Sequence, residues 1–374
     1  MQTARLHLLA EEKRLLWHLR TTGPLPRTEL ALALQVSNSA LTKLSHNLIS
    51  LGLVEERRMV DVPMRGRPTI PLGIAAAGGF AAGATVHKGV LEIALVDFAG
   101  GVIALASEQV GAPGPLEFAA ILEGRINELC VRHRLLGRRF LGIGVGVPGP
   151  PTTRAGERWH TVKELPGWRD VPLRQILDDA LGMPVMLEND AKTAALAEYY
   201  LNGKIGKAST VVVILLGYGI GAGVIENGRL VKGEFGGAGE IGVLYPGELP
   251  RPSTMDLLAM LRTAGCPIES VARFDALTIG FEDVIDAWLD RAAVQLEALV
   301  NSAIAWFDPD DIVFSSPLPA AVVARLAARL NALPLHWPGL RARGQVRVST
   351  LGGSAVALGA ALLPIHAATV LVFR

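Results

Sequence analysis

The chain has 374 residues, of which half are hydrophobic and 19% are charged, and its formal net charge is +1. This length exceeds one ordinary compact core, so we expect two or more folding units. The near-neutral charge excludes a global basic field for nucleic acid, and the two cysteines, Cys130 and Cys266, exclude a disulfide framework or a cysteine-rich zinc cluster.

Positive charge gathers near the amino terminus. Residues 1–75 hold ten Lys or Arg against six Asp or Glu, whereas the remaining residues hold 26 against 29. A basic head on a slightly acidic body indicates that the head meets phosphates. The first residues do not have the pattern of a signal peptide, and we expect a cytoplasmic protein that does not enter the membrane.

Three helices are predicted in the head. Leucines at helical spacing between residues 9 and 19 predict the first helix, and residues 27–34 predict a short second one. A tight turn over 35–37 leads into the third helix at 38–51, where Ser37 is well placed to cap the helix.

A predicted strand over 53–56 and a basic hairpin over 57–68 complete a winged helix-turn-helix. Such a unit lays its second helix in the major groove, and its wing meets phosphates or the minor groove. A merely solvated polar face is the alternative interpretation. The residues that we expect to contact DNA are Ser37, Asn38, Ser39, Thr42, Lys43, His46, Asn47, Arg57, Arg58, Arg65 and Arg67.

From residue 74 onward, predicted strands alternate with predicted helices. The strands are expected at 79–86, 91–97, 140–147, 185–188 and 211–216, and the helices at 116–132 and 191–202. A glycine run at 217–223 follows the last of these strands. This order predicts an α/β fold with two lobes and a cleft.

Six short motifs occur in this order along the chain: Gly66-Arg67-Pro68, 142–149, Leu165-Pro-Gly-Trp168, Glu188-Asn-Asp-Ala191, 217–223 and 236–242. On these motifs the chain resembles the transcription-regulator branch of the ROK family (repressor, open reading frame, kinase). The resemblance implies an actin-like ATPase fold with a sugar site between two lobes. The predicted domains are therefore a winged helix-turn-helix at 1–73 and a two-lobed ROK sugar-kinase-like sensor at 74–374.

Three polar residues are the main candidates for sugar binding. Asn189 and Asp190 stand where a strand ends and a helix begins, a common position for ligand groups in α/β sheets. An Asn side chain can donate and accept, and a carboxylate can accept from two hydroxyls. The resemblance places Asp190 at the general-base position of the family's kinases, and Glu240 at a second sugar contact. The alternative roles are a helix cap for Asp190 and a loop charge for Glu240.

The phosphate-binding elements of the family's kinases are not preserved. The resemblance aligns Thr85 with the Asp of the kinase phosphate loop, and His87 with a Gly of that loop. These replacements remove a carboxylate that organises magnesium and a glycine that lets the backbone approach phosphate. Ser315-Ser316 stands in place of a Gly-Gly pair, and Gly352-Gly353 lies later in the chain. We therefore expect no ATP binding and no enzymatic activity, with Asp190 as a vestigial base.

The family's zinc site is also replaced. Val243 stands at the position of a His, and residues 244–256 contain no cysteine, so four soft or imidazole ligands are missing. We expect neither metal nor cofactor. Asp256 is the candidate for a sugar-binding Glu that the family places after its last zinc Cys.

These observations predict a transcription regulator, a repressor that binds operator DNA and senses a sugar or a related metabolite. Lobe closure would act on the head through the connection at 69–77. The alternatives are an active ROK sugar kinase with a DNA-binding head, and a regulator controlled by a partner protein. Because helix-turn-helix proteins commonly read two half-sites, we expect a homodimer or homotetramer.

Overall fold

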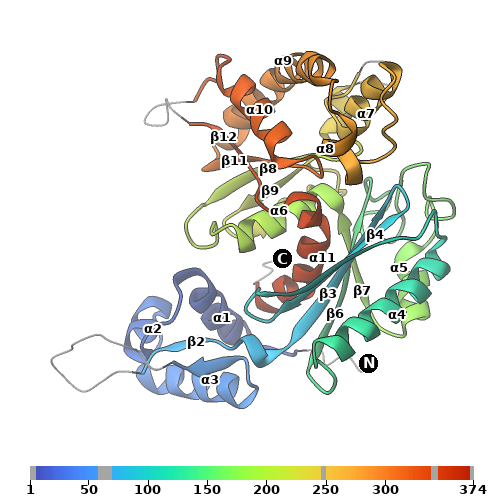
Figure 1. Cartoon of the computed structure of the whole chain (residues 1–374). Coiled ribbons are helices and arrows are strands. Elements are labelled where there is room, and N and C mark those ends of the chain that lie inside the picture. Colours follow the sequence, from blue (N-terminus) through green and yellow to red (C-terminus); the bar gives the residue numbers. More distant parts are fainter. Residues whose placement is uncertain (1–5, 58–69, 246–249, 338–343, 371–374) are drawn as a thin grey trace.

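The computed structural model describes residues 6–57, 70–245, 250–337 and 344–370. Figure 1 shows an amino-terminal head beneath two five-stranded sheets, with two helices packed between the sheets. We call the sheet formed by residues 80–189 with its helices the first lobe, and the sheet formed by residues 210–348 with its helices the second lobe. This arrangement confirms the predicted α/β class with two lobes.

The head has the expected helix-turn-helix. Its elements are α1 (Ala10–Thr22), α2 (Arg27–Leu34), α3 (Asn38–Ser50), β1 (Val54–Glu56) and β2 (Leu72–Ile74). Gln35 takes the left-handed conformation with φ 56°, which ends α2. The Ser37 hydroxyl then accepts a hydrogen bond from the Ala40 amide at 3.2 Å and caps α3, as predicted.

The wing is an antiparallel pair of strands. Val54 of β1 pairs with Ile74 of β2, so the strand pair extends one residue beyond the predicted boundary at 73. Arg58, Arg65 and Arg67 of the predicted basic hairpin lie outside the described residues.

The first lobe contains the predicted opening hairpin. Its strands are β3 (Phe80–His87), β4 (Val90–Asp97), β5 (Val102–Gln109), β6 (Phe140–Val147) and β7 (Val185–Asn189), in the spatial order β5-β4-β3-β6-β7. The helices α4 (Pro115–Arg132) and α5 (Leu173–Leu181) pack on this sheet, and η1 (Ala76–Gly78) precedes it. The β3–β4–β5 ladders are antiparallel and β6 and β7 run parallel to β3.

The second lobe has the strand order β10-β9-β8-β11-β12. Its strands are β8 (Thr210–Leu216), β9 (Ile220–Glu226), β10 (Arg229–Leu230), β11 (Asp311–Ser315) and β12 (Val346–Val348). Its helices are α7 (Thr254–Thr263), α8 (Phe274–Leu277), α9 (Glu282–Phe307) and α10 (Ala320–Asn331), with the short η2 (Ile241–Leu244) and η3 (Val271–Arg273).

The glycine run predicted to follow β8 is only partly a loop, because β9 begins inside it at Ile220. The glycines serve packing there: a Cβ on Gly223 would lie 2.6 Å from the Ala191 carbonyl oxygen. The run therefore combines a turn with a strand that a helix approaches closely.

That helix is α6 (Asp190–Leu201), which packs with α11 (Ala355–Thr369) between the two sheets. Small residues allow this close contact, since a Cβ on Gly359 would lie 1.7 Å from the Thr193 carbonyl oxygen. The turn η5 (Gly352–Ser354) leads into α11. The segment 352–369 has the length and hydropathy of a membrane span, but two thirds of it is buried inside this fold, which identifies it as a core helix.

Candidate DNA-binding face and effector pocket

The outward face of α3 is exposed, as a recognition helix requires. Ser37, Asn38, Ser39, Thr42, Lys43, His46 and Asn47 are all exposed, whereas Leu41, Ser45 and Leu48 of the same helix are buried against the head. Within the described part of the chain, neither Lys43 nor His46 forms a hydrogen bond or an ion pair. Both side chains are therefore free to meet a ligand along α3.

Two of the residues expected at DNA are engaged inside the head instead. The Asn47 amide donates to the Glu12 carboxylate, which is buried and also accepts from the Leu9 amide at 2.8 Å. The Arg57 guanidinium donates to the Ile74 carbonyl at 2.9 Å and pairs with Glu55 at 3.2 Å. These contacts hold the head together, so the structure does not present Asn47 and Arg57 as free DNA-binding groups.

Helix α1 of the head rests on both lobes. Arg20 donates to the Phe98 and Ala99 carbonyls at 2.7 and 3.1 Å, which lie in the β4–β5 turn of the first lobe. Its guanidinium carbon also lies 5.7 Å from the centre of the Tyr200 ring on α6.

On its other side, α1 meets Gly228 of the second lobe and Gly206 of the loop that leads into that lobe. A Cβ on Gly228, in the β9–β10 turn, would lie 2.2 Å from the Trp17 ring, and a Cβ on Gly206 would lie 2.1 Å from the Thr21 carbonyl oxygen. The head therefore contacts the sensor directly through α1. The expected connection is correspondingly shorter, because 72–74 form strand β2 of the wing.

Asn189 and Glu240, two of the candidate sugar-binding residues, contact each other. The Asn189 amide nitrogen donates to the Glu240 carboxylate and to the Gly149 carbonyl, each at 3.2 Å. The Asn189 side-chain oxygen accepts from the amides of Ala191 and Lys192 and so caps α6. Because both ends of its amide are used, Asn189 holds three chain segments together around Asp190.

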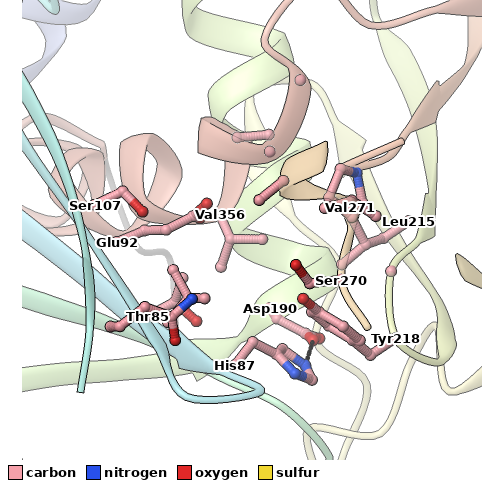
Figure 2. Close-up of a pocket in the computed structure, with 18 residues that line it drawn as sticks. Thr85, His87, Glu92, Ser107, Asp190, Leu215, Tyr218, Ser270, Val271 and Val356 are labelled. Atoms are coloured by element: carbon pink, nitrogen blue, oxygen red, sulfur yellow. Dashed lines mark ion pairs between the residues drawn. The ribbon is translucent and has the colours of Figure 1, made fainter. Parts of the chain in front are cut away.

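Asp190 lies at the first turn of α6 and faces His87 on β3. One carboxyl oxygen accepts from the Ala191 amide at 2.8 Å, and the other lies 3.9 Å from Nε2 of His87, as Figure 2 shows. Burial raises the pKa of Asp190 to about 7, and burial lowers the pKa of His87 to about 4. At neutral pH His87 is therefore an uncharged neighbour of Asp190 and not its counter-ion.

The site also contains a buried lysine that the sequence did not single out. Lys192 has no exposed surface, and its ammonium group donates to the Gly236 carbonyl at 2.5 Å. Burial lowers its pKa, against the attraction of Glu188 and Glu240. Glu188 in turn pairs with Lys232 at 2.7 Å. The position of Lys192 two residues after Asp190, on the same helix end, was the available signal in the sequence.

Asp256 is not brought to this cluster. It lies in the first turn of α7, where Ser253 caps the helix by accepting from the Asp256 amide. Its carboxylate accepts from the Trp288 indole at 2.7 Å and from the Arg291 guanidinium, both on α9. These hydrogen bonds join α7 to α9, so Asp256 stabilises the packing of two helices in the second lobe.

The side chains at the phosphate-loop positions, Thr85 and His87, contact other parts of the protein. The Thr85 hydroxyl donates to the Gly146 carbonyl at 2.9 Å in the sheet. The His87 ring stacks on Tyr218, with ring centres 4.4 Å apart and planes at 25°. His87 comes from the first lobe and Tyr218 from the turn after β8 of the second, so the two rings join the lobes across the cleft (Figure 2).

A cavity of about 250 Å³ lies beside this ring pair, between the lobes. Its polar lining is Thr85, His87, Glu92, Ser107, Gln109, Asp190, Tyr218 and Ser270, and Val90, Leu215, Val271 and Val356 supply apolar surface. Gly352 and Gly353 also line it. Ser316 does not; its hydroxyl donates to the Leu216 carbonyl at 2.8 Å.

At the position that corresponds to the family's zinc site, Val243 is 78% exposed and Leu244 is 59% exposed. Cys130 and Cys266 are buried in the cores of different lobes. Among the residues that the structure describes, no group of three His, Cys, Asp or Glu side chains is placed to hold a metal ion.

Comparison with known proteins adds family information to this geometry. The profile described as the ROK family matches residues 85–270. The uncharacterized protein y4fQ of Sinorhizobium fredii is 31% identical over 96% of this chain and 91% of its own length. The xylose repressor of Caldicellulosiruptor bescii is 30% identical over 58% of this chain, and the match spans 53% of that repressor.

A crystal structure of a ROK family transcriptional regulator, described as a homologue of the Escherichia coli Mlc protein, has the same fold. It superposes with a TM-score of 0.70 at 20% identity and covers 96% of both chains. The similarity therefore extends through the head as well as both lobes.

Proposed function

The chain belongs to the ROK family, and we propose that it is a DNA-binding transcription regulator, a repressor whose sensor binds a sugar and does not transfer phosphate. In this proposal the head at 1–73 binds operator DNA in the cytoplasm, and the body at 74–374 is the sensor. Related proteins include a xylose repressor, which supports both the regulatory role and the sugar as its input. We further propose that the chain acts as a homodimer or homotetramer, as two-fold half-sites require.

The main support for a sensor that does not transfer phosphate is the replacement of two residues in the phosphate loop. Thr85 and His87 stand where a phosphotransferase needs a carboxylate and a glycine, and both side chains already have partners in the protein. Without that carboxylate the loop lacks the group that organises magnesium, and His87 adds a side chain where a glycine would let the backbone approach phosphate. The Asp190 carboxylate can then accept a hydrogen bond from a sugar hydroxyl, but no phosphoryl group is present for that hydroxyl oxygen to attack.

We assign sugar binding to Asp190 and Glu240, with Asn189 as the residue that positions them. The second oxygen of Asp190 is available for a hydroxyl because only the first accepts from the backbone. Glu240 is held by Asn189 through one oxygen. We leave Asp256 out of the sugar site because its carboxylate joins α7 to α9 through Trp288 and Arg291, and among the described residues it has no hydrogen bond to Asn189, Asp190 or Glu240.

We propose that the signal passes from the cleft to the head through α1. Arg20 contacts the first lobe and Trp17 contacts the second, so a change in the angle between the lobes cannot leave both contacts unchanged. A ligand that favours one lobe arrangement would then favour one head position.

The test uses the full chain and an operator selected by the chain from random duplexes. Calorimetry with monosaccharides identifies a sugar that binds, and operator affinity is then measured with and without it. The proposal expects binding of at least one sugar, a change in operator affinity, and no transfer of phosphate from ATP to that sugar. Phosphorylation of a hexose would favour the kinase. Absence of any sugar binding would favour control by a partner protein.

A further inference from the structure

The cavity between the lobes has a charge pattern opposite to that of a phosphate site. None of the described residues that line it is Lys or Arg, and its one imidazole, His87, is uncharged at neutral pH because burial lowers the pKa of His87 to about 4. Two of its lining residues, Glu92 and Asp190, are carboxylic acids. A phosphorylated ligand would bring negative charge to two carboxyl groups with no cation facing it.

The pairing of three strands places Glu92 in the wall of the cavity. Glu92 on β4 pairs with Thr85 on β3 and with Ser107 on β5, so the three side chains form one row on the same face of the sheet. The next row holds His87, Val90 and Gln109. Two rows of side chains, all of them hydrogen-bonding except Val90, therefore face the cavity from three adjacent strands, as Figure 2 shows for Thr85, Glu92 and Ser107.

Glu92 is the acidic group of this wall. It is half-buried, and in the described ranges of the chain its carboxyl group makes no hydrogen bond and no ion pair. One of its oxygens lies 3.4 Å from the position of a Cβ on Gly353, near the amino end of α11. The Glu92 carboxyl group therefore lies near the amino end of α11. A helix amino end favours anions, so an anionic ligand would otherwise bind at this place. Burial raises the pKa of Glu92 to about 7, as expected for a carboxyl without a partner.

The remaining surface suits a small, partly apolar ligand. The volume of about 250 Å³ is below the roughly 300 Å³ at which drug-sized ligand pockets begin, which favours a ligand of monosaccharide size over a nucleotide. The apolar side chains and the Tyr218 ring supply contact surface, and an aromatic face also attracts cations.

We infer that this cavity binds the amine-bearing part of an unphosphorylated amino sugar, with Glu92 as the acceptor of the ammonium group and Asp190 as the acceptor of a hydroxyl. The inference rests on the proposed sugar-sensing function and specifies its ligand. The site uses the space between the lobes, so one ligand touches Glu92 of the sheet, Asp190 of α6 and Tyr218 of the second lobe.

The test is calorimetry on the full chain at pH 7.5 with glucosamine, galactosamine and mannosamine, each compared with its parent hexose and its 6-phosphate. A charge-assisted hydrogen bond predicts that at least one amino sugar binds about tenfold or more tightly than its parent hexose. We expect the 6-phosphates to bind more weakly than the unphosphorylated forms. In Glu92→Gln the preference for the amine should disappear, whereas Glu117→Gln, an exposed substitution on α4, should retain it.

The inference is overturned if no amino sugar binds, if a 6-phosphate binds most tightly, or if Glu92→Gln keeps the full preference. Its failure is separable from failure of the proposed function. If neutral hexoses bind without preference for the amine and still change operator affinity, the sensor assignment stands and the ligand class is wrong. If amino sugars bind as predicted but operator affinity does not change, the ligand class stands and the regulatory assignment is wrong.

Discussion

Replacing Asp190 with Asn removes a buried titratable group while keeping an oxygen that can accept from the Ala191 amide. Burial raises the pKa of Asp190 from 3.8 to about 7, with Glu240 adding repulsion and the Ala191 hydrogen bond acting in the other direction. The folded chain therefore binds this proton more tightly than the unfolded chain does. The resulting stabilisation is fully present below about pH 4 and is lost as the pH rises to about 7.

The size of the effect follows from the shift. The difference between 3.8 and about 7 is about three pKa units, and each unit corresponds to about 1.36 kcal/mol. Relative to Asp190→Asn, the wild-type chain should therefore lose up to about 4 kcal/mol of unfolding free energy between pH 4 and pH 8. His87, whose pKa burial lowers, acts in the opposite direction in both proteins, so the comparison between them isolates Asp190.

The assay is urea unfolding of both proteins at several pH values from 4.5 to 8, followed by tryptophan fluorescence. Trp159 and Trp168 are fully buried in the first lobe and report its unfolding. Asp179→Asn, which changes an exposed carboxylate on α5, controls for the loss of a surface charge. A difference between wild type and Asp190→Asn that stays constant with pH, or that favours wild type as the pH rises, would refute the assignment of Asp190 as a desolvated carboxyl.

Three further outcomes are expected. Lys43→Ala and Arg67→Ala should each weaken operator binding. In Arg67→Ala the magnitude of the slope of log affinity against log salt concentration should fall by about one. An unchanged slope would contradict a contact between the wing and a phosphate. Light scattering at micromolar protein should give the mass of a dimer or tetramer, and a strict monomer with and without operator DNA would contradict recognition of two half-sites. Elemental analysis should find far less than one zinc per chain, whereas stoichiometric zinc would mean that other ligands replace the family's set.

The parts of the fold that follow from local pattern could be predicted from the sequence. The helix-turn-helix pattern and the Ser37 cap located α3, and two predicted strands at 79–86 and 91–97 located the β3–β4 hairpin. The contact between Asn189 and Glu240 was also anticipated, because each lies in a motif that the family resemblance assigns to one site.

The groups that the sequence did not reveal depend on contacts between distant segments. Glu92 looks like an ordinary strand residue until the register of three strands places it in the cavity wall. The stack of His87 on Tyr218 depends on how the two lobes face each other. The sequence made Asp256 a candidate for sugar binding, but its carboxylate accepts a hydrogen bond from Arg291 on another helix.

The contact between head and sensor was hidden for the same reason. The sequence suggested that the head and sensor meet through the connection at 69–77, whereas β2 includes part of this segment and α1 contacts both lobes directly. Arg20 and Trp17 resemble ordinary surface residues of an amphipathic helix in the sequence. Only the docked arrangement shows that their partners, Phe98 and Gly228, belong to different lobes.

The most direct test of the central claim is the affinity of the full chain for its selected operator, with and without a sugar that calorimetry has shown to bind. A coupling of roughly 1–3 kcal/mol predicts a change in operator affinity of about 5- to 150-fold. The response should disappear in Asp190→Ala and persist in Asp179→Ala. If saturating sugar leaves the operator affinity of the wild-type chain unchanged, or if Asp190→Ala responds fully, the cleft does not control the head and the account is contradicted.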